Sequence, residues 1–173
     1  MKNLELKAFY PDLQVASRIA ISIGAHKEWQ HTQTDTYFKV ATGKLKMRQV
    51  AGHPAELIFY NRADSKDSKI SDYDIFYTNE AVRLREILAK VLPIELTVVK
   101  NRTLFLWQNV RIHLDRVEEL GNFIEFEAVL GSDESEEQAR EKLEYLKEKF
   151  AIQPDSLIAH GYYELLYNKH NSV

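Results

Sequence analysis

The sequence predicts an α+β fold in which many short antiparallel strands form a barrel or a strongly curved sheet, with helices at its periphery. Three observations predict it. Most of the chain consists of short segments in which charged and apolar residues alternate. Turns that contain glycine separate several of these segments. Apolar residues at helical spacing are confined to stretches after the first strand, in the middle and near the end.

The composition is that of a single globular domain spanning residues 1–173. The chain has 173 residues, of which 45% are hydrophobic and 28% charged, enough for one sizeable core. A net charge of −3 argues against a general nucleic-acid-binding surface. There is no cysteine, which excludes disulfides and thiolate metal sites. No run is apolar enough for a signal peptide or a membrane span, so we expect a cytoplasmic protein with no membrane partner.

The first half of the chain predicts five or six strands and two helices. A strand over residues 3–9 precedes a helix that begins near Pro11 and ends near Gly24. Further extended segments are expected over residues 26–40 (as one or two strands), 44–50, 56–62 and 73–77. Residues 64–72 are polar and rich in serine, and we expect a mobile loop there. Thr78 can cap a helix that ends before Pro93.

The second half predicts four more strands and two more helices. Residues 94–100 and 102–108 read as two strands joined by a tight turn near Asn101. A hairpin over residues 110–130 follows, with Gly121 supplying the positive φ of its turn. Ser132 or Ser135 can cap a helix that ends near Phe150. A last helix is expected over residues 157–167.

The hairpin over residues 110–130 carries the charges around which we expect the fold to be organised. Arg111, His113 and Asp115 share one side of its first strand, and Glu125 and Glu127 share one side of its second. Other strands repeat this one-sided pattern with Glu5, Lys7, Lys44, Lys46, Arg48, Arg62, Lys100 and Arg102. Taken alone, the charged side of any one of these strands is explained by exposure to water. Together they predict a charged lumen, if the sheet closes and the helices cover its apolar outer face.

A lumen rich in lysine and arginine suits a polyanion, because arginine binds phosphate oxygens bidentately and lysine acts as a point charge. The carboxylates would repel a bare phosphate chain, but they suit divalent cations that bridge phosphates. The pattern therefore indicates metal plus polyphosphate. His113 is interpreted as a satisfied polar residue rather than a ligand, and Trp29 and Trp107 as packing residues rather than base-stacking platforms.

Five segments carry motifs that occur together in one family. They are residues 3–7 (NLELK), 35–48 (DTYF followed by GKLKMR), 57–62 (LIFYNR), 100–102 (KNR) and 113–127 (HLDRVEELGNFIEFE). They resemble the motifs of the CYTH family, the triphosphate tunnel metalloenzymes that include class IV adenylyl cyclases, thiamine triphosphatases and inorganic triphosphatases. The resemblance extends to about Tyr167, is most specific over residues 113–127, and is closest to the class IV adenylyl cyclase-like branch.

The resemblance implies an eight-stranded antiparallel β-barrel (a triphosphate tunnel), a divalent metal such as Mg²⁺ or Mn²⁺, and a small-molecule triphosphate substrate. By position it assigns metal binding to Glu5, Glu125 and Glu127, and catalytic roles to Glu5, Lys7 and Glu127. The phosphates would be held by Lys7, Lys44, Lys46, Arg48, Arg62, Lys100, Arg102 and Arg111. Asn3 stands where the family motif has its first glutamate, which removes one negative charge. A homodimer is also implied. The tyrosine-rich segment over residues 162–167 is interpreted as a packing face, with the apolar patch of that dimer as the alternative.

Several functions stay open on this evidence. Metal-dependent hydrolysis of a nucleoside, thiamine or inorganic triphosphate is favoured over cyclisation of ATP to cyclic AMP and pyrophosphate, because we can name no residue that orients a ribose. A non-catalytic nucleotide or polyphosphate binder is the third reading, and Asn3 favours it. A structural domain whose charged faces meet water is the last. The residues do not distinguish ATP, thiamine triphosphate and tripolyphosphate.

Overall fold

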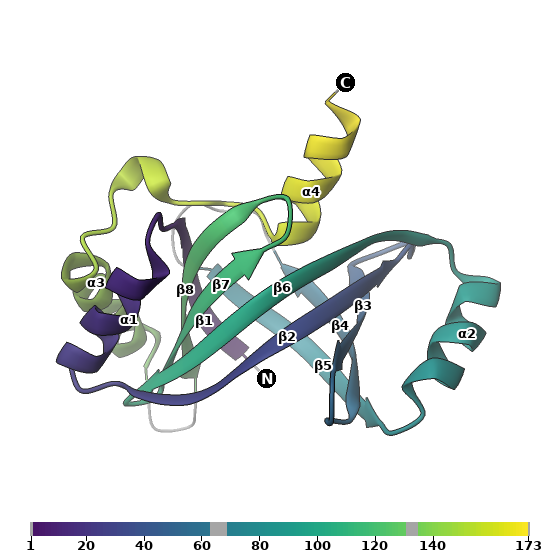
Figure 1. Cartoon of the computed structure of the whole chain (residues 1–173), viewed down its shortest axis with the longest axis horizontal. Helices are drawn as coiled ribbons and strands as arrows, with labels where there is room; N and C mark the ends of the chain where they lie inside the picture. Colours follow the sequence, from purple (N-terminus) through teal and green to yellow (C-terminus); the bar gives the residue numbers. More distant parts are fainter. Residues whose placement is uncertain (1, 63–68, 131–134, 173) are drawn as a thin grey trace.

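The fold of the protein is described by a computed structural model. It describes residues 2–62, 69–130 and 135–172, and the backbone alone at residues 2, 62 and 69–72. Over these residues the strands form a closed antiparallel barrel in the order β1-β5-β4-β3-β2-β6-β7-β8. The strands are β1 (Lys2–Phe9), β2 (His26–Phe38), β3 (Lys44–Val50), β4 (Ala55–Arg62), β5 (Lys69–Thr78), β6 (Ile94–Trp107), β7 (Val110–Val117) and β8 (Gly121–Leu130). The predicted eight-stranded antiparallel barrel with peripheral helices is thus confirmed (Figure 1).

The barrel closes between its first and last strands. β1 pairs with β8 along its whole length, in a register that places Glu5 opposite Glu127 and Lys7 opposite Glu125. On its other side, in the described part of the chain, β1 pairs with β5 through residues 2–5. Because side chains alternate along a strand, this register brings alternate residues of the first and last strands to the same inner wall.

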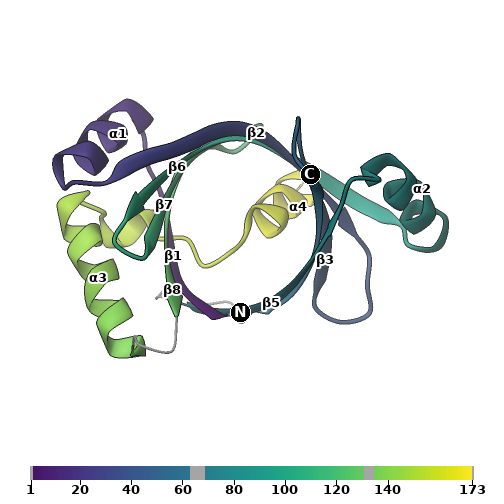
Figure 2. The same cartoon turned by 90° about the horizontal axis from the view of Figure 1, so that it is seen from below.

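Three helices lie outside the barrel. α1 (Leu13–Ser22) and α3 (Glu136–Lys149) pack against β1, β7 and β8, and α2 (Ala81–Val91) lies on the opposite side (Figure 2). Asp12 caps α1, and Ser135 forms a capping box with Gln138 at the start of α3. The core under α1 and α3 is apolar and includes Ala16, Ala20, Ile112, Phe126, Leu143, Leu146 and Phe150. α1 and α3 therefore cover the apolar outer face of β1, β7 and β8, as the sequence predicts, whereas no residue of α2 is buried.

α4 (Tyr162–Asn171) lies within the outline of the barrel when the barrel is viewed along its axis (Figure 2). Its apolar side chains, Tyr162, Tyr163 and Leu166, pack with residues of β2, β6 and β8 and are buried. The segment proposed from the sequence as a dimer patch is therefore mostly used within the fold, and the homodimer stays a prediction. None of the helices in the described part of the chain is both long and apolar enough to cross a membrane.

Three sequence-based predictions of element boundaries are wrong, and one alternative that the sequence left open is decided: β2 is a single strand, with two register shifts. β6 runs without a break through Asn101, where a turn was expected, because Lys100 and Arg102 both face inward from one continuous strand. β5 begins at Lys69, inside the expected loop, whose residues 64–68 lie outside the described part. The last helix begins only at Tyr162.

Candidate functional site

The barrel encloses a cavity of about 520 Å³. Inward-facing side chains of the strands line it, and Gly161 and Tyr162 close part of its wall from the start of α4. The predicted charged lumen is therefore present. Its lining contains most of the residues assigned from the sequence, namely Glu5, Lys7, Lys46, Arg48, Lys100, Arg102, Arg111, Glu125 and Glu127.

Two predicted phosphate ligands are not brought into this lining by the described contacts. Lys44 pairs with Glu164 of α4 at 3.3 Å, and its ammonium lies 3.6 Å from the centre of the Tyr163 ring. It therefore sits beside α4 rather than in the wall of the cavity. Arg62 lies at the end of β4, where its backbone pairs with Ser71. The side chain of Arg62 is outside the described part of the structure, so its role stays a prediction.

Three cations converge on Asp35, which is 1% exposed. Arg48 donates two hydrogen bonds to the Asp35 carboxylate at 2.8 and 3.0 Å, and Lys100 and Lys46 lie 2.9 and 3.2 Å from it. Burial would raise the pKa of Asp35, but Arg48, Lys100 and Lys46 together hold it well below its usual range. Glu56 also lines this wall, 3.7 Å from Arg48, so two carboxylates face three cations and the wall keeps a small excess of positive charge toward the cavity when both lysines are protonated.

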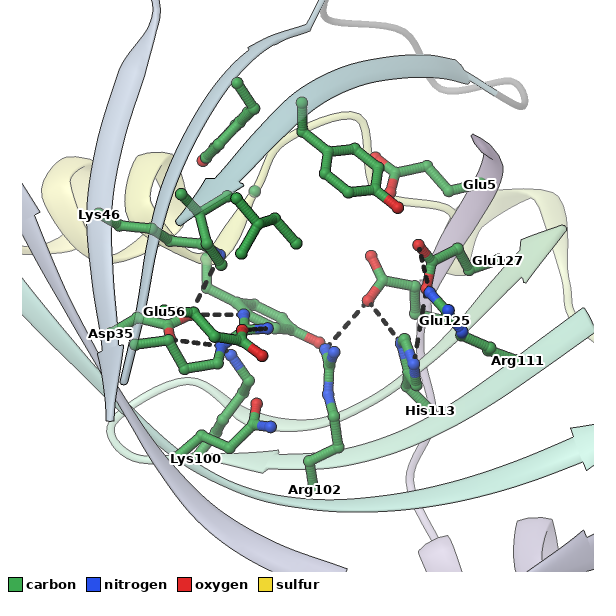
Figure 3. Close-up of a pocket in the computed structure, with 18 of the residues that line it drawn as sticks. Glu5, Asp35, Lys46, Glu56, Lys100, Arg102, Arg111, His113, Glu125 and Glu127 are labelled. Atoms are coloured by element: carbon green, nitrogen blue, oxygen red, sulfur yellow. Dashed lines mark hydrogen bonds and ion pairs between the residues drawn. The ribbon is translucent and has the colours of Figure 1, made fainter. Parts of the chain in front are cut away.

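Arg102 stands between the basic wall and the carboxylates of the opposite wall (Figure 3). It donates to both oxygens of Asp115 at 2.7 and 2.6 Å and to Glu125 at 3.0 Å. Asp115 is fully buried and also accepts a hydrogen bond from the Tyr162 hydroxyl at 2.7 Å. The guanidinium is therefore held rigidly, and α4 is tied to the same cluster through Tyr162.

Glu5, Glu125 and Glu127 gather on the wall opposite Asp35 (Figure 3). Lys7 lies 3.1 Å from Glu125, and Arg111 lies 3.5 Å from Glu127. Glu125 and Glu127 thus each have a cation nearby. The predicted acidic cluster is assembled from strands that are far apart in the sequence.

His113 lies between Glu125 and Glu127. One ring nitrogen is 3.3 Å from Glu125 and the other is 3.7 Å from Glu127. The imidazole is buried and contacts a carboxylate on each side, which agrees with its interpretation as a satisfied polar residue. It also fixes the spacing of the two glutamates.

The oxygen-rich end of this wall has the donor chemistry that suits a divalent cation. Asn3 donates through its amide nitrogen to Glu127 and, at 3.2 Å, to the Tyr73 hydroxyl, while its buried Oδ1 accepts nothing from the described residues. An orphaned neutral oxygen beside two facing carboxylates is what a hard cation prefers. Among the described residues no three acidic or histidine side chains yet converge at ligand geometry. Glu5, Glu125 and Glu127, with Asn3 beside them, are the residues that would hold the ion.

The pKa of Lys100 falls to about 7, from an ordinary value of 10.5. Burial lowers it most, Asp35 acts against the fall, and the positive charges of Arg48, Arg102 and Lys46 lower it further. Lys46, which is also buried, has its pKa lowered to about 8. Around neutral pH these lysines therefore change charge in the empty cavity, and a bound anion would recharge them.

We expect binding of tripolyphosphate to weaken by about tenfold between pH 6.5 and 8.5, because the anion must reprotonate Lys100 at the higher pH. The stability of the ligand-free fold changes in the opposite direction. The folded pKa lies below the unfolded one, so the unfolded chain binds more protons between about pH 7 and 10.5 and stability rises with pH there. Calorimetric titration of the wild type and of Lys100→Arg checks this. Arginine stays charged, so an equally steep pH dependence in Lys100→Arg would contradict the assignment.

Sequence reasoning missed three kinds of residue in the site. Asp35 and Asp115 act as buried counter-ions, and nothing in alternation alone separates them from metal ligands. Tyr162 reaches the cavity from α4, which no strand pattern could show. Trp29 lines the cavity, and its ring also packs against His31 with ring centres 5.0 Å apart, so its assignment to packing is not contradicted. Trp107 does pack, stacking on Tyr145 of α3 with ring centres 5.1 Å apart.

Comparison with known proteins agrees with this architecture. PH1012 from Pyrococcus horikoshii OT3 matches with a TM-score of 0.84 at 19% identity, over 94% of this chain and 98% of its own. The conserved hypothetical protein Pfu-838710-001 from Pyrococcus furiosus matches with a TM-score of 0.82 at 21% identity, over 94% and 99%. A protein from Vibrio parahaemolyticus, named a "putative adenylate cyclase", matches with a TM-score of 0.80 at 16% identity, over 95% and 97%. These likenesses are to the fold.

Comparison with the curated proteins finds no match. The model of the CYTH domain matches residues 1–162, which is most of the chain and contains every strand of the barrel. The motif segments that suggested this family all lie within the matched residues. With the closed eight-stranded barrel and its charged lumen, this match shows that the chain belongs to the CYTH family.

Proposed function

We propose that the protein is a divalent-metal-dependent enzyme that binds a triphosphate in its tunnel and hydrolyses it. The observation that carries the proposal is the separation of charge in the cavity. Lys46, Arg48 and Lys100 surround Asp35 on one wall, with Glu56 3.7 Å from Arg48, whereas Glu5, Glu125 and Glu127 stand on the other (Figure 3). A polyphosphate chain needs the first wall, and a Mg²⁺ or Mn²⁺ ion that bridges its oxygens needs the second.

The residues of the chain would contribute mainly by positioning and by neutralising charge. Lys46, Arg48 and Lys100 would hold the non-reacting phosphoryl oxygens, and Arg102 would reach the phosphorus nearest the carboxylates. Lys7, 3.1 Å from Glu125, is placed to stabilise charge that develops on the leaving group. A metal ion held by Glu5, Glu125 and Glu127 would supply Lewis-acid stabilisation and a more acidic attacking water.

Cyclisation of ATP uses the same phosphate and metal residues and is the alternative reaction. One observation favours a nucleoside substrate: aromatic and aliphatic side chains line part of the cavity, including Trp29 and Leu104. Hydrolysis still requires less, because it needs only a held triphosphate and access for water, whereas cyclisation must place a ribose hydroxyl in line with the α-phosphorus.

Turnover with a panel of substrates tests the proposal. Purified protein would be incubated with Mg²⁺ or Mn²⁺ and ATP, thiamine triphosphate or tripolyphosphate, and orthophosphate, pyrophosphate and cyclic AMP would be measured. Metal-dependent release of orthophosphate supports hydrolysis. Stoichiometric cyclic AMP and pyrophosphate from ATP, without orthophosphate from tripolyphosphate, would establish the cyclase instead. Saturable binding with no turnover of any substrate would leave a non-catalytic binder.

Removal of one positive charge from the basic wall should weaken the binding of long phosphate chains more than the binding of short ones. We expect Lys46→Met to weaken triphosphate binding by about tenfold and diphosphate binding by less, because each charge-assisted contact contributes about 1.5–3 kcal/mol. The melting temperature of the ligand-free protein should hold or rise, since Lys46 is crowded by Arg48 and Arg102. Lys149→Met removes the same charge from the outer face of α3 and serves as the control. An equal loss of affinity for both ligands would show that this wall does not distinguish phosphate chains of different length.

A further inference from the structure

Tyr162, the first residue of α4, is a residue of the cavity wall to which the proposed function gives no role. Its side chain is buried and lines the cavity, although it comes from a helix and not from a strand of the barrel. The chain just before α4 is tied to β1, because the backbone N–H of Ile158 donates to the carbonyl oxygen of Lys7 at 2.9 Å. The start of α4 is therefore held close to Lys7.

The ring face of Tyr162 lies against the ammonium group of Lys7. The Lys7 nitrogen is 4.0 Å from the ring centre and 3.1 Å from a carboxylate oxygen of Glu125, and the Lys7 side chain is buried. A cation that is removed from water is attracted to an aromatic face when it lies within about 6 Å of the ring centre. The Lys100 ammonium is farther from the ring, at 5.6 Å, and lies 2.9 Å from Asp35. The ring therefore acts mainly on the position of Lys7.

The hydroxyl of Tyr162 acts on a second cation through a carboxylate that lies between them. It donates to Oδ2 of Asp115 at 2.7 Å, and the same oxygen accepts from Arg102 at 2.6 Å. Burial raises the pKa of Tyr162 well above its usual value, and the charges of Asp115 and Glu125 raise it further, so the hydroxyl keeps its proton and remains a donor. The Tyr162 hydroxyl therefore helps to fix the orientation of the Asp115 carboxylate, and with it the position of the Arg102 guanidinium.

One side chain thus acts on two cations that come from separate parts of the barrel. Lys7 belongs to β1 and Arg102 to β6, and these strands are not neighbours in the barrel. Glu125 also contacts both cations, at 3.1 and 3.0 Å. Glu125 is a proposed metal ligand, however, so its oxygens would be shared with the ion. Tyr162 is not among the proposed ligands, so its contacts stay available to the two cations.

We infer that Tyr162 is a positioning residue for triphosphate hydrolysis, which fixes Lys7 through its ring and Arg102 through its hydroxyl. The inference rests on the proposed function, which places Lys7 at the leaving group and Arg102 at the phosphorus nearest the carboxylates. Binding of the phosphate chain belongs mainly to the basic wall around Asp35, which Tyr162 does not support to the same degree. Misplacement of Lys7 and Arg102 should therefore lower kcat and leave KM almost unchanged.

Three single variants separate the ring from the hydroxyl. Tyr162→Phe keeps the ring and removes the hydroxyl, and Tyr162→Leu removes both. Tyr163→Phe is the matched control, because it removes the neighbouring hydroxyl, which donates at 2.8 Å to Glu95, a residue that is not among the described residues of the cavity wall. Turnover of ATP and of tripolyphosphate with Mg²⁺ would be expressed per binding site, and the sites would be counted by calorimetric titration with tripolyphosphate in the absence of metal.

The expected result is a loss of kcat in two steps. We expect kcat per site to fall about fivefold in Tyr162→Phe and about a hundredfold in Tyr162→Leu, with KM within about threefold of the wild-type value, because a small misplacement of a catalytic group is costly. Tyr163→Phe should match the wild type in both constants. Counting the sites ensures that a smaller fraction of folded protein is not mistaken for a lower kcat.

A cycle of double variants distinguishes positioning from general damage to the fold. If the ring acts through Lys7, the difference in kcat between Tyr162→Phe and Tyr162→Leu should disappear when both are combined with Lys7→Met. Release of phosphate from radiolabelled ATP keeps the slow turnover of Lys7→Met measurable. General damage would lower kcat by the same factor with and without Lys7→Met, and that result would overturn the inference.

Failure of this inference differs from failure of the proposed function. Wild-type turnover with an unchanged kcat per site in Tyr162→Leu, or with a raised KM at unchanged kcat, would overturn the role of Tyr162 and leave hydrolysis standing. If the wild-type protein hydrolyses neither ATP nor tripolyphosphate, nor thiamine triphosphate, the proposed function fails and the inference fails with it.

Discussion

Substitution of Glu127 by glutamine is expected to lower metal-dependent triphosphate turnover by about a hundredfold or more, with the fold intact. Glu127 faces Glu5 across β1 and β8, and Asn3 donates to it. The substitution removes the negative charge and preserves the shape, and the side chain lies in the cavity wall rather than in the apolar core. Turnover and Mn²⁺ affinity, followed by electron paramagnetic resonance, should fall together while the melting temperature changes little.

The matched control for Glu127→Gln is Glu136→Gln. Glu136 lies at the start of α3, half exposed, where it pairs with Arg140 at 2.8 Å. The same charge is removed, but far from the cavity, so neither turnover nor Mn²⁺ affinity should change. Undiminished Mn²⁺ affinity in Glu127→Gln would remove this glutamate from the metal site.

Substitution of Asp115 by alanine is expected to lower the free energy of unfolding by about 3–5 kcal/mol, since it breaks a buried ion pair from one side. Asp115 is fully buried and accepts from Arg102 and from Tyr162. Without it the buried guanidinium keeps only Glu125 as its close partner in the described contacts. Urea denaturation followed by circular dichroism measures the loss.

A double variant distinguishes the lost charge pair from simple loss of packing. Asp115→Ala combined with Arg102→Met leaves no uncompensated buried cation, so it should be less destabilised than Asp115→Ala alone. If the double variant loses as much unfolding free energy as the two single variants lose together, the unpaired cation is not the cause of the instability.

The Asp115–Arg102 pair should also make the stability of the protein depend on pH. Burial would raise the pKa of Asp115, but Arg102 outweighs it and the pKa is lowered. A lowered pKa in the folded state means that the stabilisation is present above the unfolded pKa and is lost as pH falls through the folded one.

Alternation along the strands was enough to predict which charged residues face inward, because closure of the sheet leaves only two faces. It could not predict which inward charges neutralise each other. Asp35 and Asp115 have the same place in the pattern as Glu125, and only the register of neighbouring strands puts them against Arg48 and Arg102. Lys44 also follows the pattern, but α4 supplies it with Glu164, a partner more than a hundred residues away in the sequence.

The continuity of β6 shows a second limit of sequence reasoning. Asn101 looked like a turn residue because it interrupts two short runs, yet its neighbours pair along the whole strand with β2 and β7. On the outer face its side chain accepts a hydrogen bond from Gln30 at 2.9 Å. A long strand shared by two neighbours overrides the local preference of one asparagine.

Pairing of β1 with β8 has a consequence for how the protein forms. β1 is synthesised well before β8, so the contact that closes the barrel has one of the largest sequence separations among the described residues. Such non-local closure predicts a high relative contact order and slow folding. Glu5 and Glu127 meet only at this step. In a nascent or partly folded chain the two carboxylates are therefore not yet adjacent. Metal binding at this pair would indicate that the barrel has closed.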